Sequence, residues 1–381
     1  MQKINRMKII AAILVMSFLI ISVSSTLTIA APATKIKKMV IAYSNTLSTD
    51  SNRKFIASHF DVVDCGSTQY TNAKTLKSLS PNIIILGYFN AIGIYPTDSD
   101  WSYINKQESW FAHSTSGARI TSSVYGYYLM NPNSGWANYF ASRMNSFLVK
   151  YPQFSGVFLD NAPLNLQECG YTFPVSYTSF ASGILSNWET GLISQMLKTK
   201  TAVGTKIVMP NAWKYTSISE KATKATFWEN FIHGRSSAYN NAGSSTYMSL
   251  YAINALHKQA ELGNIIAVNS GCKNADSYPT AAKQWQKFTL ACFLMAVVDL
   301  EKAYYSWQFY NTDSSKGEFA EMSLQLGPPV ADYKLLIKNT YIREFTYYYV
   351  VANLDAASSS SFNINGIGYT LQPRNAMFIK K

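Results

Sequence analysis

The chain has 381 residues, of which 48% are hydrophobic and 14% are charged. This balance excludes a disordered or collagen-like polymer and indicates a large buried core. The formal net charge is +12, but outside residues 35–38 the lysines and arginines are scattered along the sequence. A nucleic-acid binder usually carries a clustered basic stripe, so we expect no nucleic-acid partner. The basic surface either keeps the protein soluble or attracts an acidic polysaccharide or an anionic envelope.

Residues 1–30 have the composition of a secretory signal peptide. Lys3, Arg6 and Lys8 precede an apolar run over residues 9–23, and small residues follow at 26–33. The run is about fifteen residues long, shorter than the roughly twenty that cross a bilayer as a helix. We therefore expect a cleaved signal, a secreted protein and no membrane span after cleavage. If the signal is retained as an anchor, we expect the protein at the cell surface.

From residue 39 onward, short β-rich runs alternate with longer helical patterns, which favours parallel βα units over a β-sandwich. Some of the short runs are apolar without alternation, as expected for strands that are covered on both faces. The predicted strands are residues 39–44, 60–65, 82–89, 155–161, 206–211, 225–230, 264–269 and 302–307. The predicted helices are residues 51–59, 71–79, 136–151, 175–199, 217–223, 246–263 and 281–298.

Eight strands with intervening helices predict a (β/α)8 TIM barrel over residues 31–329. The connection at 217–223 is short for such a barrel. The connection at 90–135 is long, and long ordered loops are usually functional, so we expect it to wall a cleft. After residue 329 the pattern changes to short strand-like runs at 335–337, 346–353, 361–364 and 375–380. These runs predict a small antiparallel β domain over residues 330–381, with Asn365 and Gly366 in a hairpin turn.

The candidate site residues follow from the predicted barrel, because active sites in this fold lie at the C-terminal ends of the strands. Several aromatic side chains also lie in predicted mouth loops and suit the faces of sugars, although aromatic residues dominate ordinary cores as well. We expect two or three of them at most to contact a sugar. The candidate substrate-binding residues chosen on these grounds are Tyr43, Asp64, Tyr88, Trp110, Asn161, Asn211, Trp228, Asn230, Asn269 and Trp307.

Two carboxylates are the candidate catalytic residues. Asp160 ends the apolar run at 156–160, and Glu229 ends the run at 225–229 between aromatic neighbours. An apolar setting raises the pKa of a carboxyl group, which suits a proton donor. Two carboxylates across a cleft are what glycoside hydrolysis requires. Each also has a structural alternative, because a strand-end Asp can cap a helix and a strand-end Glu can pair with a nearby cation.

No cofactor or metal motif accompanies these carboxylates. The sequence contains no G-x-G-x-x-G, P-loop or G-x-S-x-G pattern, and its four histidines and four cysteines lack metal-ligand spacing. We therefore expect neither a nucleotide cofactor nor a metal. Export permits disulfides, but Cys65, Cys169, Cys272 and Cys292 allow three full pairings and none is assigned. Cys292 lies in an apolar run and is expected to be a buried thiol.

The sequence from residue 39 to the C-terminus resembles the hypothetical glycosyl hydrolase family 15, secreted barrels related to the α-amylase and α-galactosidase superfamily. The resemblance is carried by the motifs at 109–113, 117–119, 129–132 with 135–136, 156–161 and 228–231. Arg119 of the second motif joins the candidate substrate-binding residues. Asn131 stands where the family pattern suggests an acidic residue, so the resemblance implies no third carboxylate there.

The resemblance implies roles for the two carboxylates. In α-galactosidase-like relatives an Asp that ends the fourth strand is the nucleophile, and a carboxylate that ends the sixth strand is the acid/base. Motif by motif, these correspond to Asp160 and Glu229, which implies a retaining mechanism. We therefore expect a secreted, monomeric glycoside hydrolase that acts on an oligo- or polysaccharide. The alternatives are a barrel that binds carbohydrate without catalysis and a structural protein of the cell envelope.

Overall fold

Eight parallel strands form the centre of the molecule in a computed structural model, which describes residues 33–166, 180–212, 216–234, 236–240, 243, 245–308 and 319–381. All eight lie where the sequence predicted strands. The expected signal peptide at 1–30, the first part of the helix expected at 175–199 and Cys169 lie outside these described residues. The barrel strands are β1 (Lys37–Ala42), β2 (Val62–Gly66), β3 (Ile84–Asn90), β6 (Gly156–Asp160), β7 (Ile207–Pro210), β8 (Ala225–Glu229), β9 (Ile265–Ser270) and β10 (Ala303–Trp307).

The strands are ordered β7-β6-β3-β2-β1-β10-β9-β8. Within this order every neighbouring pair is parallel and has a continuous register. The two outer strands, β7 and β8, meet only through a single parallel bridge between Asn211 and Phe227. The barrel is therefore nearly closed, and its weakest seam lies between β7 and β8. This architecture confirms the predicted (β/α)8 barrel.

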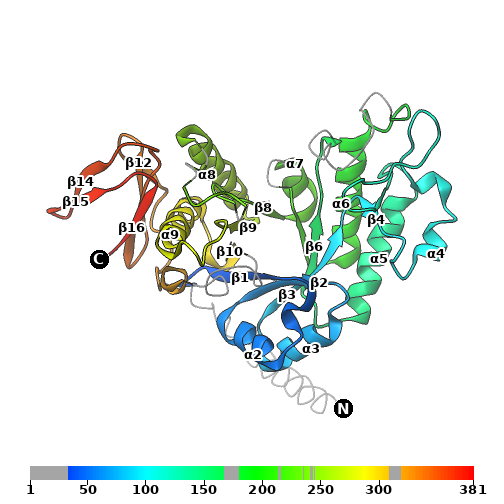
Figure 1. The fold of residues 1–381 in the computed structure, drawn as a ribbon, viewed down its shortest axis with the longest axis horizontal. Coiled ribbons are helices and arrows are strands. Elements are labelled where there is room, and N and C mark those ends of the chain that lie inside the picture. The colour runs from blue at the N-terminus through cyan, green and yellow to red at the C-terminus, as the bar shows by residue number, and fades with distance from the viewer. Residues whose placement is uncertain are drawn as a thin grey trace, which may run out of the picture. The chain divides into compact units, whose positions relative to one another are not determined.

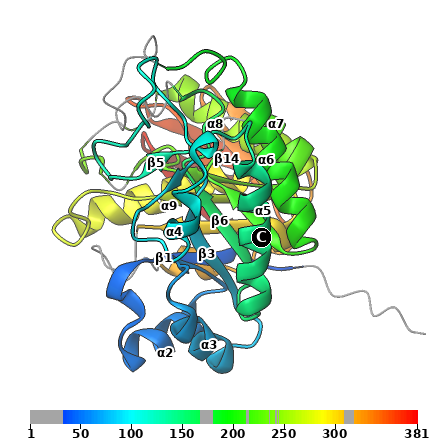
Figure 2. The ribbon, with the colours of Figure 1, turned by 90° about the vertical axis from the view of Figure 1, so that its right-hand side faces the viewer.

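Helices follow most strands and cover the outside of the barrel (Figure 1). The short connection predicted between β7 and β8 consists of one helical turn and one turn of π-helix, and it spans the same seam at which the barrel barely closes. In Figure 2, α5 and α6 lie side by side over β6. The helices are α2 (Asp50–His59), α3 (Tyr70–Leu79), α5 (Trp136–Lys150), α6 (Trp188–Val203), α7 (Thr216–Ile218) with η5 (Ser219–Thr223), α8 (Thr246–Glu261) and α9 (Pro279–Ala296). Short 3-10 turns are η1 (Ser44–Leu47), η6 (Leu300–Lys302) and η8 (Ala320–Ser323).

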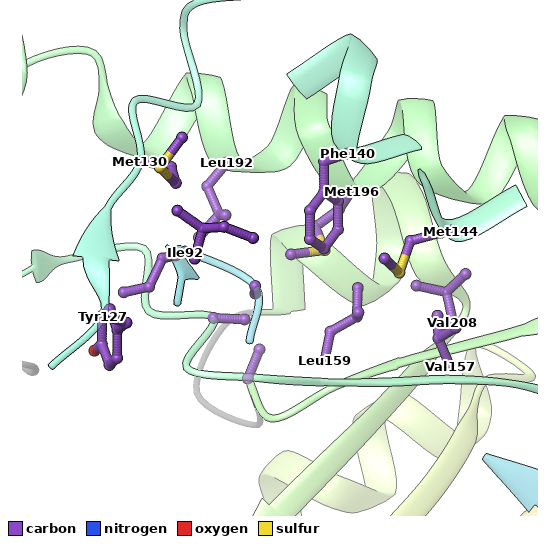
Figure 3. Close-up of a cluster of buried hydrophobic side chains, with 14 of the residues drawn as sticks. Ile92, Tyr127, Met130, Phe140, Met144, Val157, Leu159, Leu192, Met196 and Val208 are labelled. Atoms are coloured by element: carbon purple, nitrogen blue, oxygen red, sulfur yellow. The ribbon is translucent and has the colours of Figure 1, made fainter. Parts of the chain in front are cut away.

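The strands have two buried faces, which explains their apolar composition. On β6, Phe158 points into the barrel, while Val157 and Leu159 point outward into the core beneath the helices. Figure 3 shows Val157 and Leu159 beside Met144 of α5, with Met196 of α6 nearby. The barrel interior is filled by a second, apolar set of side chains: Met39, Ile41, Val62, Leu86, Phe158, Met209, Ala225, Phe227, Ala267 and Tyr304.

The long connection after β3 is folded and belongs to the core. It contains β4 (Gly93–Ile94), α4 (Trp101–Ile104), η2 (Glu108–Trp110) and β5 (Tyr128–Leu129), and β4 pairs with β5. Ile92, Tyr127 and Met130 from this connection are buried in the same cluster as α5 and α6, as Figure 3 shows. The connection is therefore fixed to the helices that follow β3 and β6. That it walls a cleft remains a prediction.

Antiparallel β-sheets follow the barrel, as the sequence predicted. A hairpin of β14 (Ser360–Ile364) and β15 (Ile367–Leu371) turns at Asn365 and Gly366, which both have positive φ as a two-residue hairpin turn requires. The sequence missed β12, which is charged at its end, and β15, which contains a glycine. The larger sheet has the order β11-β12-β13-β16, with β11 (Lys334–Ile337), β12 (Thr340–Glu344), β13 (Tyr348–Asn353) and β16 (Asn375–Lys380).

The larger sheet packs on α9 (Figure 1). Val350, Ala352 and Ala376 are buried in the same cluster as the apolar face of α9. Arg343 of β12 is also buried and donates a hydrogen bond to the carbonyl of Met295 in the last turn of α9. A buried guanidinium with a carbonyl partner fixes the sheet to the end of this helix.

Two further expectations concern thiols and membranes. Cys292 is a buried free thiol, as predicted, and Cys65 is another. Burial raises the pKa of both thiols above the usual value, so neither is a reactive thiolate. Among the helices of the described residues, none is both long enough and apolar enough to cross a membrane.

Gly156, at the start of β6, gives a test of how tightly the barrel is packed. A Cβ atom on this residue would lie 2.2 Å from the carbonyl oxygen of Ile207 on β7, so one of the two backbones must move. We expect Gly156→Ala to lower the free energy of unfolding by about 1–3 kcal/mol. Gly368→Ala is the control, because nothing lies within 4 Å of its Cβ position. Urea unfolding measures both variants, and equal midpoints would contradict this account of the packing.

Candidate active site

A ring of polar side chains lies at the C-terminal end of the barrel. Each one continues the inward-facing positions of its strand, two residues beyond an apolar side chain of the interior. The sequence predicted all of them except Ser306, whose inward position follows only from the alternation along β10. The ring consists of Tyr43, Asp64, Tyr88, Asp160, Asn211, Glu229, Asn269 and Ser306, one from each of the eight strands or the residue just after it.

Asp160 is held as a hydrogen-bond acceptor at the end of β6. The hydroxyl of Tyr88 donates to its Oδ2 atom at 2.8 Å, and the backbone N–H of Asn161 donates to Oδ1 at 2.9 Å. The amide of Asn211 donates to Oδ1 at 3.0 Å. Three donors from different segments restrict the rotation of a carboxylate. The arrangement therefore gives Asp160 a fixed orientation.

Asn211 connects the two candidate catalytic carboxylates. Its Nδ2 atom lies 3.0 Å from Oδ1 of Asp160 and 3.3 Å from Oε2 of Glu229. Because both distances start at one nitrogen, the two oxygens cannot be farther apart than about 6.3 Å. The two N–H bonds of a planar amide diverge by about 120°, so oxygens that lie along them are roughly 5.5 Å apart. The structure thus brings Asp160 and Glu229 together.

An aromatic pair lies directly below these carboxylates. Phe158 and Phe227 precede Asp160 and Glu229 by two residues on the same faces of their strands, and their ring centroids are 4.9 Å apart in an edge-to-face contact. Both rings are buried. Edge-to-face packing stabilises aromatic pairs and fixes their spacing. The pair therefore holds β6 and β8 at a defined separation beneath the polar ring.

Asp64 lies in the ring as a buried carboxyl group with Tyr43 as its partner. The Tyr43 hydroxyl donates to Oδ2 at 2.6 Å, while Oδ1 is buried and has no hydrogen-bond partner among the described residues. Burial raises the pKa of Asp64 well above its usual value, the Tyr43 hydrogen bond opposes this effect, and the charge of Asp160 adds to it. The surroundings of Asp64 therefore favour its protonated form.

Of three further asparagines near the two carboxylates, two lie beside them. Asn269 is paired in register with Glu229, and its Nδ2 donates to Ser306 Oγ at 3.1 Å, while its Oδ1 is buried without a partner among the described residues. Asn161 and Asn230 immediately follow the carboxylates, and both have positive φ. Asn tolerates this conformation better than most residues, so each one turns the chain sharply away from its strand. Asn161 and Asn269 lie beside the carboxylates, while the side chain of Asn230 packs against Gly234.

Four predicted substrate-binding residues lie elsewhere. Trp228 and Trp307 belong to the core between the barrel and the helices, where they are 6% and 1% exposed. Adjacent residues of a strand face opposite sides, so the inward Glu229 forces Trp228 outward. Trp110 packs against Trp136 and Tyr139 in the long connection. Arg119, in the same connection, forms an ion pair with Glu108 and stacks on Phe111.

One group of side chains outside the ring has metal-ligand geometry. Ligand atoms of His257, Glu261 and Asp332 lie within 4.8 Å of one another, between α8 and the start of β11. Both carboxylates are exposed, and the guanidinium of Arg343 lies 3.6 Å from Asp332. A neighbouring cation opposes the binding of a metal ion. The group is better explained as an ion-pair network that includes Arg343.

The protonated Asp64 gives a pH-dependent prediction. Because its folded pKa is raised, its contribution to stability is present below the unfolded value of about 3.9 and is lost as pH rises through the folded value. We expect Asp64→Asn, which needs no proton, to melt at a higher temperature than the wild type at pH 7 and to lose that advantage near pH 3.5.

Asp50→Asn is the control of opposite sign, because Arg53 lowers the pKa of this exposed carboxyl. Removal of the Asp50 carboxylate should lower the free energy of unfolding above pH 4, and this effect should disappear as the pH falls below that value. Calorimetry of the three proteins across this range measures both effects. An Asp64→Asn variant that is less stable than the wild type at pH 7 would contradict a protonated Asp64.

Comparisons with known proteins agree with this architecture. In solved structures, the chain is similar to a noncanonic maltogenic alpha-amylase AmyB from Thermotoga neapolitana (11% identity, TM-score 0.51, 91% of this chain and 96% of that one). It is also similar to a GH31 family sulfoquinovosidase from E. rectale (10% identity, TM-score 0.51), with coverage of 91% of this chain and 62% of that one. The glycoside hydrolase domain of PelA from Pseudomonas aeruginosa matches with 12% identity and a TM-score of 0.47, over 71% of this chain and 94% of that one. At these identities the two matches with a TM-score of 0.51 show the fold alone.

The sequence itself identifies the family. No curated protein has significant sequence similarity to the chain. The sequence profile of the hypothetical glycosyl hydrolase family 15, in contrast, matches residues 77–347, which include both strand-end carboxylates and well over half of the chain. The chain therefore belongs to the hypothetical glycosyl hydrolase family 15.

Proposed function

We propose that the protein is a secreted glycoside hydrolase that cleaves O-glycosidic bonds of an oligo- or polysaccharide by a retaining mechanism. The observation that carries this proposal is the amide of Asn211, which donates hydrogen bonds to both Asp160 and Glu229 at the open end of the barrel. Retaining enzymes hold their two carboxyl groups about 5–5.5 Å apart, whereas inverting enzymes need about 6.5–9.5 Å to admit a water molecule. The upper limit of about 6.3 Å between the bridged oxygens supports the retaining alternative.

In this proposal Asp160 is the nucleophile. Three donors, Tyr88, Asn161 and Asn211, fix the direction of its carboxylate. Its carboxylate attacks the anomeric carbon as the bond from that carbon to the leaving oxygen breaks. The product is a covalent glycosyl ester of Asp160. Only a carboxylate that stays ionised and oriented can perform this step efficiently.

Glu229 is the acid/base. Its proton passes to the leaving oxygen in the first step, and in the second step it accepts a proton from the water molecule that attacks the glycosyl ester. The second step releases the sugar and regenerates the carboxylate of Asp160 and the protonated Glu229. Glu229 stands above the ring of Phe227, so its lower side faces an apolar interior that excludes water.

The remaining ring residues bind the sugar in this proposal. Oδ1 of Asp64 and Oδ1 of Asn269 are buried and have no hydrogen-bond partner. A buried polar atom without a partner is costly, and a sugar hydroxyl would satisfy each of them. The rings of Tyr43 and Tyr88 pack edge to face, with ring centroids 5.1 Å apart. The site therefore offers hydroxyl partners on both sides of the two carboxylates.

Export of the protein is also part of the proposal. The basic residues, apolar run and small residues of positions 1–33 are those of a secretory signal. A polymeric sugar substrate is generally met outside the cytoplasm, which agrees with such a signal. N-terminal sequencing of the protein recovered from the medium and from the membrane fraction distinguishes a cleaved signal from a retained anchor.

The two roles can be separated with azide as an external nucleophile. We expect Asp160→Ala and Glu229→Ala to reduce hydrolysis of the best substrate in a panel of 2,4-dinitrophenyl glycosides by about 10²-fold or more. Azide should restore turnover in both, but with different products. Glu229→Ala should give a glycosyl azide with the anomeric configuration of the substrate, and Asp160→Ala should give the opposite configuration.

The control for this experiment is Glu301→Ala, an exposed carboxylate that pairs with Lys37 at the opposite end of the barrel. It should retain full activity. Exchanged product configurations would reverse the two roles. If the wild type binds oligosaccharides but hydrolyses no glycoside in the panel and no polysaccharide, the carbohydrate-binding alternative would replace the hydrolase.

Asn211 should act as a positioning residue. Asn211→Ala removes a hydrogen bond from each carboxylate, so we expect kcat to fall by about 10-fold to 10²-fold. KM should change little, because Asn211 orients the two carboxylates rather than the sugar. Asn145→Ala, on the exposed side of α5, is the matched control. A variant with unchanged kcat and a raised KM would show that Asn211 does not act through the carboxylates.

A further inference from the structure

Six lysines gather at the end of the barrel opposite the polar ring. Four lie in the last turns of helices that run back toward the strand N-termini, and two lie directly before strands. Because parallel strands share their direction, all six belong to the same end of the molecule. We call them the basal lysines: Lys77 of α3, Lys150 of α5, Lys200 of α6, Lys221 of η5, Lys206 before β7 and Lys224 before β8.

Hydrogen bonds and charge connect three of the basal lysines across neighbouring segments. Lys200 donates to the carbonyl of Lys206 at 2.7 Å, and Lys206 donates to the carbonyl of Phe154 before β6 at 2.9 Å. Lys77 donates to the carbonyl of Ile83 before β3. Burial, and after it the charge of Lys206, lowers the pKa of Lys77, so these two ammonium groups also interact across the gap between their segments.

The basal lysines have almost no opposing charge. None of them forms an ion pair with a described residue, and Glu220 is the only described acid in their helix turns and the loops before β3, β6, β7 and β8. The other half of the same end is different. There Lys35 pairs with Asp61 at 3.5 Å and Lys37 pairs with Glu301 at 2.8 Å. The positive charge is therefore concentrated beneath one half of the barrel.

Helix capping explains only part of this arrangement. Cations in a last turn interact favourably with the helix dipole, which favours lysine at positions 77, 150, 200 and 221. Lys206 lies outside any helix, and Lys150, Lys221 and Lys224 are exposed to solvent. The stability of the helices does not require that acidic side chains be absent beside these exposed ammonium groups. Their absence leaves a surface that attracts anions.

We infer that the basal lysines dock this end of the barrel on an anionic lipid surface. Ala33, the first described residue, lies just before β1, at this same end of the barrel. The sequence before Ala33 contains Lys3, Arg6, Lys8 and the apolar run at 9–23. If the signal is retained as an anchor, this apolar run and the basal lysines together are the two signals that hold a protein at a membrane, and after cleavage the lysines act alone.

The position of the proposed active site favours lipid over a soluble polyanion. The carboxylates open at the far end of the barrel, so a polymer bound to the basal lysines would not lie in that site. A membrane at the base, in contrast, leaves the polar ring exposed to substrates outside it. Each lysine near an anionic surface contributes to the attraction, which decays within a Debye length.

Vesicle binding of the full chain tests this inference. The variant Lys150→Gln, Lys221→Gln and Lys224→Gln removes three exposed basal charges, and the control Lys106→Gln, Lys273→Gln and Lys334→Gln removes three exposed charges elsewhere. Cosedimentation with vesicles of equal phosphatidylglycerol and phosphatidylcholine, and of phosphatidylcholine alone, measures the preference for anionic lipid. The apolar run contributes equally in every protein, so differences report on the lysines.

We expect the basal variant to bind the anionic vesicles at least about tenfold more weakly, with a smaller salt dependence, while its binding to neutral vesicles and its melting temperature stay unchanged. The control should resemble the wild type. Equal losses in the basal variant and the control would reduce the effect to net charge and overturn the inference. If the basal variant lost binding to polygalacturonate, a soluble polyanion, and bound anionic vesicles as the wild type does, the lipid inference would be overturned in favour of a soluble polyanion.

Discussion

One side-chain amide connects the parts of this barrel that are least connected by the backbone. β7 and β8 share a single bridge, at Asn211 and Phe227, and the side chain of Asn211 bonds to Asp160 on β6 and to Glu229 on β8. The same hydrogen bonds therefore span the seam and determine how far apart the two carboxylates lie. Closure of the fold and spacing of the proposed catalytic groups depend on one interaction. Loosening either one would disturb the other.

The side chains below this amide form an apolar layer, and the polar ring lies at its upper edge. The inward side chains directly below the ring belong to the hydrophobic core, and Phe158 and Phe227 lie under the carboxylates themselves. Burying a charge without partners is expensive, so polar groups are tolerated only in the last inward layer, where the barrel opens. Asp64 shows the limit of this arrangement. It is fully buried, and the environment raises its pKa rather than stabilising its charge.

The sequence predicted the strands and the two carboxylates because both are local signals. An apolar run that ends in a single acid is visible without any knowledge of tertiary structure. The sequence was less informative about Trp228 and Trp307, because proximity to a strand end does not decide which face a side chain occupies. For Trp228 the answer was already implicit, since Glu229 and its neighbour cannot both point inward. For Trp110 and Arg119 the sequence did not contain the answer. The connection that carries them has no periodicity and folds through contacts among its own side chains and with α5.

The basal lysines illustrate a property that no reading of the sequence in order could reveal. The largest gap between consecutive members, from Lys77 to Lys150, is 73 positions along the chain, so the six look scattered. The repeated βα unit converts that scatter into a surface, because the end of each helix and the start of each strand return to the same level of the barrel. The same repetition places every strand-end polar group at the other level. A parallel barrel therefore separates two kinds of chemistry, and the separation depends on the direction of its strands rather than on contacts between the two ends.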